Sequence, residues 1–129
     1  MNYLAIVVAA AASFAVGGAW YSPMAFGPAW LAAIGKKPEE MGSPARPLAI
    51  TAALTLVSAY VLAWVIAGMG ITSLIGGAGV GLSIGIGLVA TAMATDVLFT
   101  GGKLELLWIN AGQRTASLVV MGAILGAWR

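Results

Sequence analysis

Four long apolar stretches, separated by short polar or glycine-containing segments, run along the chain at residues 2–21, 48–69, 74–99 and 104–128. Each has about 20 residues or more, enough for an α-helix to cross a ~30 Å hydrocarbon core at 1.5 Å per residue. The pattern predicts an all-α fold, in which residues 1–129 form one polytopic domain of four transmembrane helices.

A shorter apolar segment follows the first stretch. Residues 20–23, Trp-Tyr-Ser-Pro, should end the first helix, because proline disfavours helical geometry at the residue before it. Residues 24–35 carry no charge until Lys36 but are too few to span, and Pro28 can begin a short helix. Two interpretations stay open for this segment: an interfacial or partly re-entrant helix, and a loop packed on the bundle.

The fourth stretch carries an unusual polar face. Asn110, Gln113, Arg114 and Ser117 stand at i, i+3, i+4 and i+7, so they project from one side of one helix. Lipid cannot satisfy such groups. We therefore expect this face to meet other helices, water or a partner.

Polar side chains in two other stretches should lie at a similar depth. Thr51, Thr55 and Ser58 form a stripe in the second stretch, and Asp96 stands one turn before the third stretch ends. Hydroxyls at this spacing more often make helix contacts or bond their own backbone than bind ligands. The candidate intramembrane cluster comprises Thr51, Thr55, Asp96, Asn110, Gln113, Arg114 and Ser117.

Asp96 and Arg114 are the two charges of this cluster. Their depths differ by roughly six residues, or ~9 Å, and side chains that lean toward their own helix N-terminus would bring them closer. The sequence therefore predicts that they pair. Such a pair would either lock the last hairpin or belong to a polar pocket or conduit.

Small residues mark candidate helix-packing faces. Gly77, Gly81 and Gly85 form a small-xxx-small ridge, and Gly122 and Gly126 repeat that spacing in the fourth stretch. Packing within the chain and homo-oligomerisation both account for the ridge. In the first stretch, Ala11, Ala15 and Ala19 predict another smooth strip.

Composition places the chain among membrane proteins. Of its 129 residues 61% are hydrophobic and 8% charged, whereas soluble domains have about a quarter charged. There is no cysteine and no histidine, so thiolate chemistry and the commonest metal ligand are excluded. We expect no enzyme activity, no cofactor, no metal and no nucleic-acid partner.

Basic residues predict the orientation. Lys36, Lys37, Arg46 and Lys103 lie in the first and third loops, whereas the second loop has none. Positively charged loops stay in the cytoplasm, so both termini should be non-cytoplasmic. A cleaved signal peptide is the less favoured interpretation of the first stretch, because no Lys or Arg precedes its apolar run.

Three motifs suggest a family. Trp-Tyr-Ser-Pro at 20–23 is followed by Phe26, Gly27 and Trp30; Leu-Trp-Ile-Asn-Ala-Gly occupies 107–112, and Met-Gly-Ala-Ile-Leu-Gly-Ala-Trp occupies 121–128. In this order they resemble the small bacterial four-helix membrane proteins of domain-of-unknown-function family 1761. The resemblance implies a four-helix protein of a bacterial inner membrane. It supplies no catalytic residue, and Gln113 stands where the family commonly has tyrosine.

Two function classes agree with these features. The first is a structural or assembly protein, a homo-oligomer or a subunit of a larger membrane complex, with the bilayer as its surroundings. The alternative is a small transporter or channel component for a small polar solute or ion.

Overall fold

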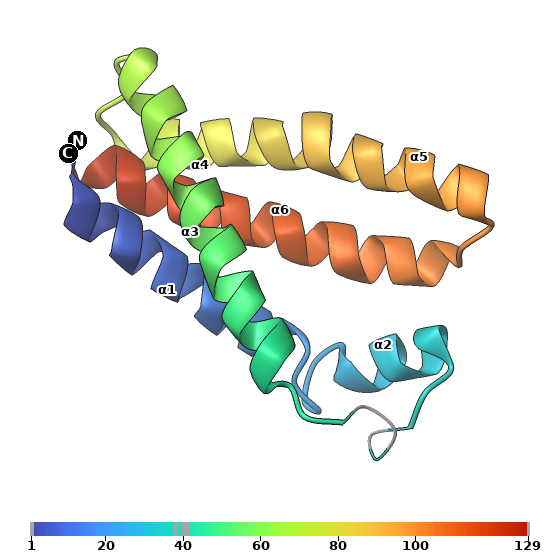
Figure 1. Ribbon diagram of the computed structural model, residues 1–129. Helices are drawn as coiled ribbons and strands as arrows, with labels where there is room; N and C mark the ends of the chain where they lie inside the picture. Colours follow the sequence, from blue (N-terminus) through green and yellow to red (C-terminus); the bar gives the residue numbers. More distant parts are fainter. Residues whose placement is uncertain (1, 38, 40–41, 129) are drawn as a thin grey trace.

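The computed structural model describes residues 2–37, 39 and 42–128, and within them it contains helices and no strand. In chain order the helical segments are α1 (Tyr3–Trp20), α2 (Gly27–Ile34), α3 (Ala45–Gly68), α4 (Leu74–Ile84), η2 (Gly85–Ala90), α5 (Thr91–Thr100) and α6 (Leu104–Ala127) (Figure 1). The all-α prediction is confirmed.

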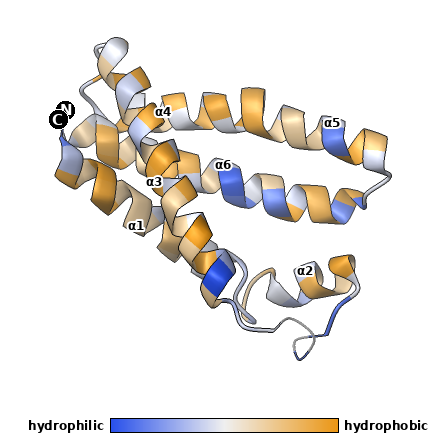
Figure 2. Cartoon of the chain, viewed as in Figure 1, coloured by the Kyte–Doolittle hydropathy of each residue, from blue (hydrophilic) through white to orange (hydrophobic). Residues whose placement is uncertain are grey.

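Three described helices are long and apolar enough to cross a membrane. They are α1, α3 and the continuous helix Leu74–Thr100, which joins α4, η2 and α5. The fourth predicted span, α6, is equally long at 24 residues but is not one of the three. Its hydrophilic positions interrupt the apolar surface and lower its hydropathy (Figure 2).

The third of these helices changes its winding in the middle. Residues 85–90 form a π-helical segment, η2, between two α-helical halves. A π-turn bonds i to i+5 and frees a carbonyl from the α-helical pattern. The hydroxyl of Thr91 donates to the carbonyl oxygen of Gly87 at 2.9 Å, which satisfies one backbone acceptor there.

The other helical segments are arranged around α6, which contacts each of them and meets α4 most extensively. A Cβ on Gly77 or Gly81 would overlap the α6 backbone, and one on Gly85 would lie 2.9 Å from it. On α6, a Cβ on Gly122 or Gly126 would overlap the α4 hairpin in return. The glycine ridge is therefore covered by α6 of the same chain, and contact with a second copy through it would displace α6.

The hydrophobic core lies in the half of the bundle that holds both termini. There Ala59 and Ile66 of α3 join Ile6, Met121 and Leu125 in one buried cluster. All buried residues of α3 lie in its second half, and α5 has none. The bundle is thus tight at the terminal end, while α3 and α5 diverge at the other (Figure 1).

The segment after α1 forms a true helix. Pro28 stands in the first turn of α2, and Gly35 ends it in the left-handed conformation with φ 73°. A Cβ on Gly27 would lie 2.5 Å from the Tyr21 carbonyl oxygen, so only glycine fits this turn. Residues 27–34 are therefore a helix and not the loop of the second interpretation, although they do pack on α6 as that interpretation expected. The interfacial or re-entrant placement of this helix stays a prediction.

Candidate functional site

Two sequence motifs meet at the junction of α1 and α6. Trp20 donates its indole N–H to the carbonyl oxygen of Ile109 at 2.9 Å, and the Tyr21 hydroxyl donates to Asn110 Oδ1 at 2.6 Å. A Cβ on Gly112 would lie 2.9 Å from the Trp20 ring. The Trp-Tyr-Ser-Pro and Asn-Ala-Gly motifs therefore form one structural joint, with the Ile109 carbonyl oxygen and Asn110 Oδ1 as its acceptors.

The aromatic side chains of this joint also hold the start of α2. The Trp20 and Phe26 rings lie 4.8 Å apart between centroids, and Tyr21 meets Trp30 edge-on at 5.6 Å. Such pairs stabilise by about 0.5–1.5 kcal/mol beyond the area that they bury. The joint thus ties three segments together at the splayed end of the bundle.

Besides Asn110, two more members of the predicted cluster have hydrogen-bond partners inside the chain. Gln113 Nε2 donates to Ser117 Oγ at 2.8 Å, and both residues are buried. Gly17 of α1 lies opposite Gln113, where an added Cβ would come within 3.4 Å of Nε2. This pair faces α1, as expected for amides and hydroxyls that must avoid lipid.

A partly open cleft of about 810 Å³ lies between α1, α3 and α6, and residues of α2 and η2 also line it. Five of the seven residues of the predicted cluster line this cleft: Thr51, Thr55, Gln113, Arg114 and Ser117. Ser13, Tyr21 and Ser58 add further hydroxyl groups. The structure therefore brings most of the predicted polar cluster around one space.

Arg114 is the cationic residue of the cleft. It is exposed and makes no hydrogen bond or ion pair with any residue that the structure describes. Its charge reaches Tyr21, one residue beyond α1: burial raises the pKa of that hydroxyl, and the guanidinium acts in the opposite direction. The cleft thus holds a positive charge without a described counter-ion.

Asp96 lies elsewhere. It is exposed on α5, forms no ion pair with Arg114 and does not line the cleft. Gly81 contacts Leu118, and Gly85 contacts Thr115, so the level of Arg114 is near Ile86. Asp96 is about ten residues farther along, or ~15 Å at 1.5 Å per residue. The pairing predicted from the sequence is therefore not formed within one chain.

The face of α1 that meets the cleft differs from the expected one. Ala11, Ala15 and Ala19 are exposed, whereas Ser13 and Gly17 line the cleft. These two continue to Tyr21 at four-residue spacing, a stripe that the sequence contains but that the alanines obscured.

Within the described residues, no group of three or more acidic, His or Cys side chains could hold a metal ion.

Comparison with known proteins yields one family. The profile described as "Protein of unknown function (DUF1761)" matches residues 4–126, which confirms the resemblance drawn from the three motifs. No curated protein and no solved structure matches the chain.

Proposed function

The chain belongs to the DUF1761 family, and we propose that it is an integral membrane protein whose cleft binds a negatively charged solute and passes it between the two sides of the bilayer. The observation behind this proposal is the exposed guanidinium of Arg114, which lines the cleft without a described counter-ion. Placing an arginine at the centre of a membrane helix costs about 2.5–3.5 kcal/mol on insertion scales. A bound anion offsets that cost through charge-assisted hydrogen bonds.

The proposal includes α6 as a fourth membrane span. Its 24 residues extend about 36 Å, and its central position surrounds it with the other helices. Gln113 and Ser117 are buried against the chain, which supports this placement because these groups avoid lipid. An even number of spans puts both termini on one side, and Figure 1 shows the start of α1 and the end of α6 at the same end of the bundle.

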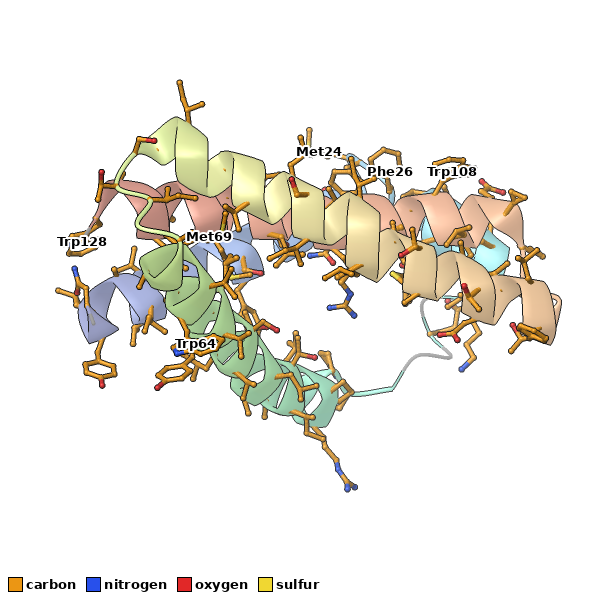
Figure 3. The ribbon with its side chains drawn as sticks, turned by 90° about the horizontal axis from the view of Figure 1, so that it is seen from above. Met24, Phe26, Trp64, Met69, Trp108 and Trp128 are labelled. Carbon is orange, nitrogen blue, oxygen red and sulfur yellow. The ribbon has the colours of Figure 1, made fainter. Side chains whose placement is uncertain are left out.

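Exposed tryptophans at the two ends of the bundle agree with helices that cross the inner membrane from one end of the bundle to the other. Figure 3 places Trp64 and Trp128 toward the end with the termini and Trp108 toward the opposite end. All three are exposed, as interfacial tryptophans are. In this orientation the splayed end of the bundle, with Lys36, Lys37, Arg46 and Lys103, faces the cytoplasm.

Single cysteines test the orientation. Ser43→Cys should react with an impermeant maleimide only from the cytoplasmic side, and Thr72→Cys only from the opposite side. Thr72 is preferred to Ser73 because the Ser73 hydroxyl caps α4 by accepting from Gly76 N–H at 3.0 Å. Labelling of both cysteines from one side would overturn the four-span arrangement.

The transport proposal is tested with benzenesulfonate, which keeps its charge and crosses lipid poorly. Proteoliposomes should take it up faster than empty liposomes, and Arg114→Gln should lower that excess about tenfold or more, because a charged hydrogen bond contributes ~1.5–3 kcal/mol. Arg46→Gln removes an equal charge outside the cleft and should keep the uptake. Equal uptake by wild type and Arg114→Gln would reject the role of the cleft.

Assembly is the second candidate function. Asp96 and Arg114 are both exposed and do not pair within one chain, so a second copy or another subunit could supply the missing partners. Light scattering of the detergent complex separates the candidates. A protein mass of 13.0 kDa corresponds to one chain, and assembly with further copies of this chain requires a multiple of it.

A further inference from the structure

We infer that the ligand of the cleft is an anionic amphiphile, with a charged headgroup at Arg114 and a hydrocarbon chain that leaves sideways into the bilayer. This inference rests on the proposed function of the cleft as an anion site, and it adds the chemical class of the ligand. Three properties of the cleft carry it: its size, its two-sided lining and the direction in which it opens.

The cleft is too large for a simple ion. Its volume of about 810 Å³ falls within the ~300–1,000 Å³ of sites that hold drug-sized molecules. A water molecule occupies ~30 Å³ of the liquid, so an ion of a few such volumes would leave most of the space unfilled. The ligand therefore has a substantial part besides its charge.

The lining offers two kinds of surface. The polar part of the lining includes the hydroxyl groups of Thr51 and Thr55 and the guanidinium of Arg114, and no described residue that lines the cleft is acidic. Phe14 of α1, Val89 of η2, and Leu118 and Met121 of α6 supply apolar walls. A hydrated polar solute would leave these walls in contact with water, whereas a molecule with an apolar part covers them.

The cleft borders the bilayer between α3 and the η2–α5 segment. α3 packs mainly on α1 and α6, while η2 and α5 pack on α6 and on the helix that they belong to. The first half of α3 diverges from α5 in both views (Figures 1 and 3). Ile86 and Leu88, which precede Val89 in η2, are 56% and 67% exposed. A hydrocarbon chain can thus leave the cleft among lipid-facing side chains.

The position of the cation suits a headgroup held below the membrane surface. Arg114 lies ten residues into α6, about 15 Å from its start, and its long side chain leans back toward that start. A lipid of the surrounding annulus keeps its headgroup at the interface. An anion at Arg114 would be drawn inward, as expected for a held or translocating molecule.

Competition with two alkanesulfonates tests the ligand class. Both carry the same headgroup, but ethane-1-sulfonate has almost no tail and decane-1-sulfonate has a long one. Decane-1-sulfonate should inhibit benzenesulfonate uptake at a concentration at least a hundredfold lower. Val89→Trp, which narrows the lateral opening, should reduce this preference at least tenfold, and Leu98→Trp on the exposed face of α5 should not.

A second measurement identifies the source of the amphiphile. Protein released from phosphatidylcholine nanodiscs that contain a little phosphatidylglycerol is examined by native mass spectrometry. One phosphatidylglycerol retained by wild type and Arg46→Gln but lost from Arg114→Gln points to a bilayer lipid. No retained lipid, together with tight inhibition by decane-1-sulfonate, points to a free amphiphile.

The outcomes separate this inference from the function on which it rests. If the two sulfonates inhibit within about threefold of each other while uptake still needs Arg114, the amphiphile is rejected and the anion site stands. If uptake equals that of empty liposomes in every variant, the proposed function fails and the inference fails with it.

Discussion

Gly81→Leu should abolish the folded protein, whereas Gly79→Leu, two residues earlier on α4, should leave it intact. A Cβ on Gly81 would overlap the carbonyl oxygen of Leu118 and lie 2.9 Å from the Val119 nitrogen. Backbone cannot move aside as a flexible side chain can, so α4 would separate from α6. Overpacking of one methylene typically costs ~1–3 kcal/mol, and leucine adds several carbons at this point.

Gly79→Leu is a matched control for this substitution. An added Cβ on Gly79 would meet nothing within 4 Å, and both variants gain the same helix propensity. The two variants are compared with wild type by size-exclusion chromatography in detergent and by thermal unfolding that is monitored by circular dichroism. If Gly81→Leu elutes and melts as wild type does, α4 does not pack on α6 through this ridge.

Gly112→Leu should detach the end of α1 from α6 and lower stability by about 1–3 kcal/mol. The new side chain would occupy the position of the Trp20 ring, so the bond from Trp20 to the Ile109 carbonyl would break. Tyr21→Phe should cost ~1 kcal/mol, because it leaves the Asn110 acceptor without its donor.

The two substitutions should be less than additive, since both act on one joint. Denaturation midpoints of the single variants and of the double variant measure the coupling. Strict additivity would mean that Trp20 and Tyr21 contact α6 independently, and the two motifs would then not form one unit.

Much of this architecture was predictable because hydropathy and helical spacing report local geometry. The four apolar stretches coincide closely with the helices, and the i, i+3, i+4, i+7 spacing placed Gln113, Arg114 and Ser117 at one cleft. Thr51 and Thr55 were predicted to lie at a similar depth from the ends of the apolar stretches, and they line the same cleft. Whether α6 spans the membrane follows less directly, since its polar residues lower the hydropathy that marks a span.

The register between helices was not predictable from hydropathy. The ends of their stretches predicted a depth difference of roughly six residues between Asp96 and Arg114, but the contact of Gly85 with Thr115 makes it about ten. The joint at Trp20 and Asn110 was also missed, because hydrogen bonds across 89 residues leave no periodic signal. The order of the motifs along the sequence indicated a family, but it did not reveal that the Trp-Tyr-Ser-Pro and Asn-Ala-Gly motifs are in contact.

The π-helical segment η2 also determines which side of α5 faces α6. Gly85 and Asp96 are eleven residues apart, just over three full turns of an uninterrupted α-helix, so Asp96 would then face α6 as Gly85 does. One extra residue in a turn rotates everything beyond it by about 100°. The π-helical segment thus changes which side of the continuous helix Leu74–Thr100 faces α6. The part before η2 packs on α6 through its glycines, whereas the part after η2 is rotated, so that the Asp96 carboxylate is directed away from the interface with α6.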